Sequence, residues 1–503
     1  MPDRAAVIAP LSRPEAERLL PRFASGRLSL EDRVLRARCL RAMETFDVAW
    51  NDLLSLRDKA REPRLRARIE QDLLHLAYFV GAKINVAALY ESALRHAGGD
   101  ALLAAEIELA WSVHRIAAND ATGSLRAAQS AQDALRAAPP DRDRELVLLR
   151  VQRQLAHVLA QSAQYRDARA AAEASLAGAR RLRDAWETAW STYATGFTSW
   201  CAGTVEDADA ALARAEELLR PFGTHLWRWT VFCLARVRIE QGSIEEGDRL
   251  ARQSAAGSVS ERGYVALACH EVDVAAQLIQ GALADERPAR DAVEGIVLAR
   301  RGDLRRAAKL LEDARTSFAA GGLDHYALGA AAHAAHVRES LAYGGGRERA
   351  IRVVGELADR GASGFAWFLP EVAEWLGKVA ITDARAAALA KVLRVRGETA
   401  RRRAQRSAPA GASEVDGVTA HLRMAGLTWR ELDIVRRLSL LAREGEDLDR
   451  DELAARLAMS PNTLRVHLTR IRAKLDVGDR RGDEAILEAV RRLPATERGE
   501  LRV

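Results

Sequence analysis

The sequence predicts an all-α fold, and three observations support the prediction. Alanine, leucine and arginine dominate the chain while aromatic residues make up only 5%, a composition that favours helices over strands. Apolar residues recur at helical spacing between capping and turn residues. One pattern of small residues also returns about every 40 residues, which indicates stacked helix pairs. With 503 residues, the chain has room for such an array and for a further module.

The repeated pattern consists of a small residue in a first helix, a turn with glycine, and alanine in a second helix. The clearest copy contains Gly295, Gly302, Leu304, Ala307, Leu311 and Ala314. Two further copies are Gly196, Gly203, Val205, Ala208, Leu212 and Ala215, and Ala235, Gly242, Ile244, Gly247 and Ala251. A fourth runs from Gln164 to Ala168 and on to Ala172, and fainter copies centre on Ala49, Ala87, Ala127 and Ala350. Small residues at such positions let paired helices approach closely.

This pattern resembles the tetratricopeptide repeat (TPR) over roughly residues 30 to 360. The resemblance implies a superhelix in which each helix pair hides its apolar face against its neighbours. The period exceeds the usual value of about 34 residues, so we expect longer helices or loops. Between 252 and 290 the pattern lapses, and we expect a degenerate repeat or a kink there. We assign residues 1–29 to an N-terminal extension and 30–400 to the array.

The cysteines give no sign of a metal site or a disulfide framework. Cys39, Cys201, Cys233 and Cys269 lie far apart, and no CxxC pair occurs. We therefore predict neither a metal nor a cofactor. Gly377 and Lys378 lack the first glycine of a phosphate-binding loop, and no other catalytic motif stands out, so we predict no enzyme activity.

The N-terminus and the hydropathy pattern favour a cytoplasmic protein. The apolar stretch from Ala5 to Leu11 is short and broken by Pro10, unlike a signal peptide. No run of about 18 apolar residues occurs, so we expect no membrane partner. The net charge of +6 is compatible with a polyanionic partner.

A basic segment ends the predicted array. Basic residues cluster from Lys391 to Arg406, and a stretch rich in Ala, Ser, Pro and Gly follows from Ser407 to Gly417. We predict a basic, flexible linker over 401–419 and a C-terminal domain over 420–503. The basic cluster has two interpretations: it supports nucleic-acid binding through phosphates, or it is an ordinary solvated helix end.

Capping signals predict three helices in the C-terminal domain. Thr428 and Glu431 form one capping box, and Asp449 and Glu452 form another. The apolar residues that follow these boxes are Ile434, Val435, Leu438 and Leu441 in the first helix, and Leu453, Ala454 and Leu457 in the second. Ser460 can cap a third helix that begins at Pro461, because the fixed φ of proline suits the first helical position.

The third predicted helix, from Pro461 to Lys474, combines an apolar stripe with a cationic face. Leu464, Leu468, Ile471 and Leu475 share one side, and Asn462, Arg465, Val466 and Thr469 share the other. Four arginine and lysine residues and no acidic residue lie in this helix. Such a helix suits a DNA major groove. Arg465 is predicted to contact guanine, Asn462 adenine, and Val466 or Thr469 a thymine methyl group.

The C-terminal domain resembles LuxR-type (GerE-like) helix-turn-helix domains. The resemblance rests on Leu427 to Glu431, Ser460 to His467, Ile471, and Lys474 to Val477. It implies that Thr463 and His467 approach the DNA backbone and that Arg465 and Val466 face the groove. It also implies that a last helix, from Asp483 to Leu493, pairs two protomers. The full set of predicted DNA-binding residues is Ser460, Asn462, Thr463, Arg465, Val466, His467, Thr469, Arg470, Arg472 and Lys474.

One departure from this pattern leaves a second interpretation open. Extra residues within Arg443 to Leu448 lengthen the connection between the first two helices, and this spacing also resembles the winged-helix domains of OmpR-type and SARP regulators. A winged helix needs a β-hairpin after the recognition helix, whereas Ala485 to Leu493 has a helical pattern. The four-helix type is therefore favoured.

An aromatic stripe lies within the array. Its members are Trp186, Trp190, Tyr193, Phe197 and Trp200, with Trp227 and Trp229 one repeat later. The stripe is either helix-packing core or the lining of a groove for a peptide or small effector.

The sequence as a whole predicts a transcription regulator that binds double-stranded DNA in a sequence-specific manner, as a homodimer. Its array would sense a small-molecule or peptide effector or bind a partner protein. The alternative is a TPR scaffold whose C-terminal domain serves docking or dimerisation and does not bind DNA.

Overall fold

The computed structural model is helical throughout the part of the chain that it describes. The described residues are 10–24, 28–81, 84–254, 256–269, 271–282, 286–341, 345–364, 369–379, 381–407, 431, 434–435, 438, 450–456, 461–475 and 486. Every regular element in these ranges is an α-helix or a short 3-10 helix, so the predicted all-α fold is confirmed.

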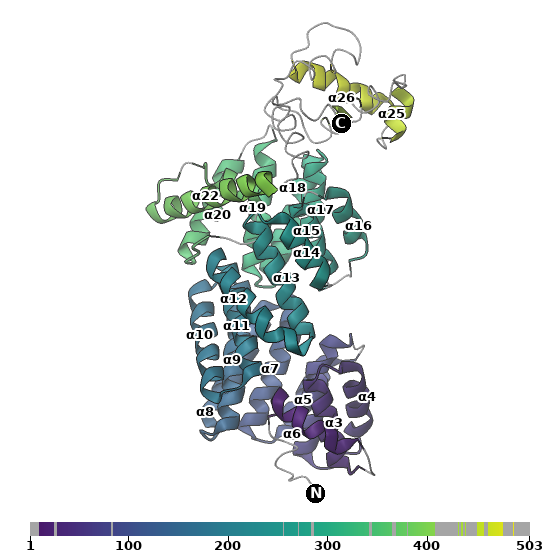
Figure 1. The fold of residues 1–503 in the computed structure, drawn as a ribbon, viewed down its shortest axis with the longest axis vertical. Helices are drawn as coiled ribbons and strands as arrows, with labels where there is room; N and C mark the ends of the chain where they lie inside the picture. The colour runs from purple at the N-terminus through teal and green to yellow at the C-terminus, as the bar shows by residue number, and fades with distance from the viewer. Residues whose placement is uncertain are drawn as a thin grey trace.

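Most helices form antiparallel pairs that stack along the long axis of the molecule (Figure 1). The first pairs are α3 (Leu30–Ala42) with α4 (Phe46–Arg57), α5 (Pro63–Phe79) with α6 (Val86–Ala97), α7 (Ala101–Ala117) with α8 (Ala121–Ala137), α9 (Arg142–Gln161) with α10 (Tyr165–Leu182), and α11 (Ala185–Cys201) with α12 (Val205–Leu219). The later pairs are α13 (His225–Glu240) with α14 (Ile244–Ser254), α15 (Val259–Ala268) with α16 (Val272–Gln280), α17 (Arg287–Arg300) with α18 (Leu304–Ala320), α19 (Asp324–Glu339) with α20 (Gly346–Asp359), and α21 (Pro370–Leu376) with α22 (Ala384–Ser407). The architecture is a TPR-like superhelix, as predicted.

A few helices lie outside these pairs. Before the first pair come α2 (Arg13–Leu19) and the 3-10 turn η1 (Leu20–Phe23), and a second 3-10 turn, η2 (Arg220–Phe222), follows α12. Beyond the array come α25 (Arg450–Arg456) and α26 (Pro461–Lys474), at the opposite end of the molecule from α2 and α3 (Figure 1).

Glycine at the helix contacts explains the repeated pattern. A Cβ atom added to Gly196 would lie 2.7 Å from Leu212 Cγ, and one added to Gly295 would lie 2.8 Å from Leu311 Cγ. Both distances are too short for a real contact, so these helix pairs need glycine to approach this closely. The turn glycine Gly203 has φ +80°, a left-handed conformation that glycine adopts without strain.

Helix length accounts for the long period and for its lapse. The pair α9 and α10 has helices of 20 and 18 residues, whereas α15 and α16 have only 10 and 9. The region between 252 and 290 is therefore a shortened repeat. The predicted repeat centre at Ala87 is wrong, because Ala87 is exposed and Leu89, 3% exposed, takes the packing position. Alanine alone does not fix the register of a helix that carries several alanines.

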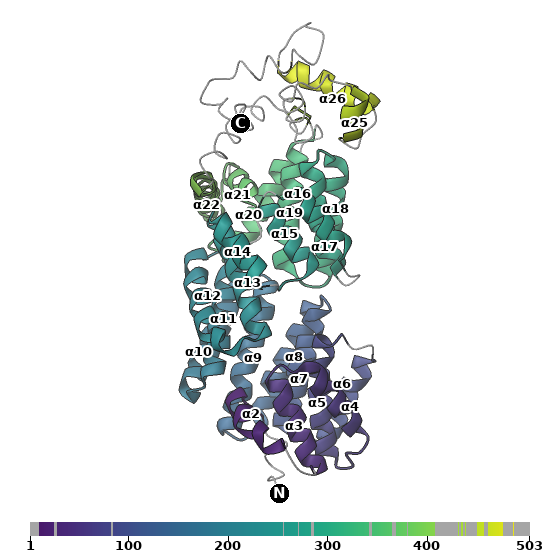
Figure 2. The ribbon, with the colours of Figure 1, turned by 45° about the vertical axis from the view of Figure 1, so that its right-hand side comes forward.

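Later repeats fold back onto the turns of earlier ones through three arginines, which we call the arginine clasps. Arg360 donates to the carbonyl of Ser162 at 3.2 Å, Arg403 to that of Gln241 at 3.3 Å, and Arg396 to that of Gly203. These carbonyls follow the ends of α9, α13 and α11, where helix carbonyls lack intrahelical donors and carry partial negative charge. The clasps hold α20 and α22 against the earlier repeats, and Figure 2 shows α22 beside α14.

The helix α22 extends beyond Ala400 to Ser407, so the first residues of the segment predicted as a linker are helical. Arginine is a good helix former, which favours this extension. Two arginines of the basic cluster, Arg396 and Arg403, are clasp residues rather than freely solvated cations.

Two further observations concern the described residues only. No helix among them is long and apolar enough to cross a membrane. The four cysteines carry free thiols, and no group of histidine, cysteine and carboxylate side chains in this part of the chain could hold a metal ion.

Candidate nucleic-acid interface and array cavity

The helix α26 has the two faces that the sequence predicts. Leu464, Leu468 and Ile471 are at most 2% exposed. Other apolar residues buried in this part of the chain are Ile434, Val435, Leu438, Leu453, Ala454 and Ile486. On the opposite face Asn462, Arg465, Val466, Thr469 and Arg470 are exposed. The apolar side chain of Val466 is 48% exposed. The helix therefore presents a cationic face with one apolar residue to the outside.

Local interactions hold this helix in place. Pro461 occupies its first position, and the Thr469 hydroxyl donates to the Arg465 carbonyl one turn earlier at 2.9 Å. The ammonium of Lys474 lies 2.7 Å from a carboxylate oxygen of Glu431, whose side chain is 2% exposed. This ion pair fastens the last turn of α26 to Glu431. The sequence pattern predicts a capping role for Glu431 and a DNA contact for Lys474, but it does not indicate their contact with each other.

Several predictions fall on residues that the structure does not describe. Ser460, Thr428, Leu441, Asp449 and Leu457 lie outside the described residues. So does the predicted last helix, Asp483 to Leu493, except for the buried Ile486. Thr463 lies within α26, but its side chain is not described. His467 and Arg472 are half-buried at the edges of the exposed face.

The aromatic stripe is buried in the array, and part of it also lines a cavity. Trp186, Tyr193, Phe197 and Trp200 are all at most 5% exposed, as in a helix-packing core. All of the stripe on α11 except Trp200 also lines a cavity of about 690 Å³, and Trp229 on α13 joins it there. We call this space the array cavity. Trp227 instead points its indole N–H to Glu216, at 2.9 Å, and does not line it.

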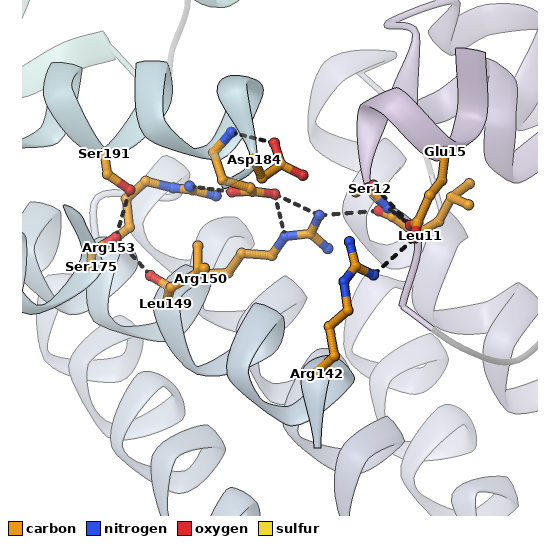
Figure 3. A network of polar contacts seen from close by, with 11 residues as sticks. Leu11, Ser12, Glu15, Arg142, Leu149, Arg150, Arg153, Ser175, Asp184 and Ser191 are labelled. Atoms are coloured by element: carbon orange, nitrogen blue, oxygen red, sulfur yellow. Dashed lines mark hydrogen bonds and ion pairs between the residues drawn. The ribbon is translucent and has the colours of Figure 1, made fainter. Parts of the chain in front are cut away.

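A buried ion-pair network forms one wall of the array cavity. Arg150 and Arg153 reach from α9 toward the start of α11, in the neighbourhood of Asp184 (Figure 3). Both guanidinium groups bind the carboxylate of Glu187, Arg150 at 2.6 Å and Arg153 at 2.7 Å. Asp184 caps α11 by accepting from the Glu187 amide at 3.0 Å, which fixes Glu187 at the first turn.

The two arginines determine the protonation state of Glu187. Burial raises the pKa of Glu187, but the neighbouring charges of Arg150 and Arg153 outweigh burial and leave the pKa below its ordinary value. Glu187 is therefore ionised at neutral pH. Burial lowers the pKa of His75 to about 3 and that of His157 to about 4, so these two of the three histidines on the cavity wall are neutral there. Burial also lowers the pKa of the third, His225.

The fold places the chain among helical-repeat proteins of TPR-like architecture. No protein-family pattern matches the sequence, and no curated protein matches it. Among solved structures, a Rap protein complexed with Competence and Sporulation Factor is 16% identical over 69% of this chain and 92% of its own, with a TM-score of 0.41. The apo form of RapI is 15% identical, covers 78% and 92%, and has a TM-score of 0.30. The Cut9-Hcn1 hetero-tetramer of APC/C gives 10% identity, 79% and 92% coverage, and a TM-score of 0.30.

Proposed function

We propose that this protein is a transcription regulator that binds double-stranded DNA through α26 and receives an effector or partner protein on its array. The observation that carries the proposal is the exposed face of α26, where Arg465, Val466 and Thr469 lie opposite a buried apolar stripe. A helix anchored on one side and cationic on the other can enter a major groove without disturbing its domain.

Some residues of this face would contact bases, and others would contact phosphates. Arg465 would bind guanine, Asn462 adenine, and Val466 and Thr469 a thymine methyl group. The Thr469 hydroxyl already donates within the helix, which leaves its methyl group for the base. Arg470, Arg472, Thr463 and His467 would contact phosphates, as would Ser460 at the start of the helix. Lys474 would contribute little charge, because Glu431 neutralises it.

The proposal is tested by selecting duplexes from a random DNA pool with the full chain and then measuring affinity for a selected and a scrambled duplex. We expect Arg465→Ala to reduce the preference for the selected duplex by about tenfold or more, because one bidentate base contact contributes roughly 1–3 kcal/mol. Arg470→Ala should weaken binding to both duplexes equally and reduce the salt dependence by about 0.9 log units per log unit of salt. Lys474→Ala should change that slope much less.

The matched control is Arg169→Ala, which removes an exposed arginine from α10 on the array. It should leave both affinities unchanged. Failure to select any sequence, or unchanged discrimination by Arg465→Ala, would contradict the proposal. That result would favour the alternative of a TPR scaffold whose terminal domain docks or dimerises. We also propose that the regulator acts as a homodimer, for which the selected site should contain two half-sites about one helical turn apart.

A further inference from the structure

We infer that the array cavity binds a small organic anion, a molecule with one carboxylate, sulfonate or phosphate group on a flat apolar body. The inference rests on the effector-sensing part of the proposed function and names the chemistry of the effector. Three properties of the cavity carry it: its size, its aromatic walls, and an excess of cationic groups over carboxylates on its surface.

The size of the cavity suits a small molecule. Its volume of about 690 Å³ lies within the range of roughly 300–1,000 Å³ that is common for ligand pockets. Side chains from widely separated helices line it, among them His75 of α5, Arg150 of α9, Trp190 of α11 and Tyr326 of α19. A bound molecule would therefore contact several repeats at once.

Aromatic side chains make up much of the wall. Only 5% of the chain is aromatic, yet nine phenylalanine, tyrosine and tryptophan side chains line this one space. Trp186, Trp190, Tyr193 and Phe197 come from successive turns of α11 and form one continuous strip. Such a strip favours a flat apolar body that can stack on the rings.

Cationic side chains outnumber carboxylates on the cavity wall. Five arginines but only four glutamates line the cavity. On one wall Arg150 and Arg153 share the carboxylate of Glu187. The Glu187 side chain is 1% exposed, whereas those of Arg150 and Arg153 are 16% and 10% exposed. The cavity therefore faces two guanidinium groups that share one directly bonded carboxylate, that of Glu187.

Arg236 adds a second cationic point on the wall. It is 4% exposed, stacks over Trp200 at 4.2 Å, and lies 3.5 Å from the carboxylate of Glu261. Within the described part of the chain, its Nε and Nη2 atoms have no hydrogen-bond acceptor. A buried guanidinium with unused donors favours an acidic group on the ligand. Burial lowers the pKa of all three histidines on the wall, His75, His157 and His225, so the cationic character comes from arginine.

Two fluorescent probes that differ by one charge test the inference on the full chain. Anilinonaphthalene sulfonate carries a sulfonate on joined aromatic groups, and N-phenylnaphthylamine has the same aromatic groups without the sulfonate. We expect the unmodified chain to bind the sulfonate probe with one site per chain and more tightly than the neutral probe. Energy transfer from tryptophan to the bound probe should place it near Trp186, Trp190 and Trp229, which line the cavity.

Variants then separate the charge from the apolar wall. Arg153→Gln leaves the Arg150 and Glu187 pair intact, and it should weaken the sulfonate probe about tenfold while changing the neutral probe less than about twofold. The matched control is Arg142→Gln, on the same helix but 52% exposed and outside the cavity lining, and it should leave both affinities unchanged. Ala194→Phe, which places a ring in the cavity, should abolish binding of both probes.

Equal weakening of both probes by Arg153→Gln, tighter binding of the neutral probe, or unchanged binding in Ala194→Phe would overturn the inference. If Arg153→Gln does not fold, the probe preference of the unmodified chain and the effect of Ala194→Phe decide the matter. The titrations contain no DNA, and Arg465→Ala should bind both probes normally. Failure here is therefore distinguishable from failure of DNA binding.

Discussion

At the scale of single residues, buried histidines make the stability of the array sensitive to acid. His333 in α19 is 3% exposed and its Nδ1 atom donates to the Gly329 carbonyl at 2.9 Å. Burial lowers its pKa to about 4, below the ordinary value of 6.5. The unfolded chain therefore takes up a proton first, so the contribution of His333 to stability is complete above about pH 6.5 and is lost as the pH falls toward 4.

The lowered pKa of His333 leads to a prediction that urea unfolding can test. Between pH 7 and pH 5 the free energy of unfolding should fall, and the fall should be smaller by about 1–2 kcal/mol in His333→Leu, which removes the titrating group. The other buried histidines will keep part of the slope in the variant. An identical fall in both proteins would show that His333 does not titrate as its burial implies.

At the scale of helices, close packing can be tested with glycines that differ only in their surroundings. Gly196→Ala places a Cβ atom 2.7 Å from Leu212 Cγ, so the pair α11 and α12 must separate. We expect a loss of about 1–3 kcal/mol from overpacking, more than the gain of up to about 1 kcal/mol from the higher helix propensity of alanine.

Gly355→Ala in α20 is the control, because an added Cβ atom meets nothing within 4 Å there. It should raise the free energy of unfolding by roughly 0.5–1 kcal/mol. Opposite signs in thermal unfolding would support the packing argument. A stabilising Gly196→Ala would refute it.

For single helices, the sequence predicts those features that depend on residues close together in the chain. The third helix of the C-terminal domain was expected from Pro461 to Lys474 and has these bounds, because a proline start and a helical apolar stripe are both local signals. The close contact at Gly196 follows from the same reasoning. The register around Ala87 does not, because alanine is common on both faces of these helices.

Side-chain contacts between helices that are far apart in the chain could not be predicted from the sequence. Arg150 and Glu187 meet because consecutive pairs rotate by a small angle, and no residue pattern states that angle. For the same reason the aromatic stripe could be located on α11, but its place on a cavity wall could not. The pairing of Lys474 with Glu431 likewise depends on how two helices cross.

At the scale of the whole molecule, the arginine clasps join turns of the superhelix that are far apart in sequence. We predict that Arg396→Ala, which removes the donor to the Gly203 carbonyl, lowers the free energy of unfolding by about 1–2 kcal/mol, as expected for a partly buried charged hydrogen bond. Amide hydrogen exchange should become faster in α22 and around Gly203. The exposed Arg385, on the same helix, supplies the control variant Arg385→Ala, which should change neither quantity.

The clasps have a consequence for how this chain reaches its native state. In an open solenoid each repeat depends on its immediate neighbours, and partial arrays can be stable. Here Gly203 meets its partner 193 positions further on, and Ser162 meets its partner 198 positions further on. During synthesis the carbonyls of Ser162 and Gly203 therefore lack their arginine donors until the last repeats have been made. Contacts between residues this far apart in sequence slow folding. Truncation after the middle repeats would leave a fragment less stable than its own helix contacts suggest.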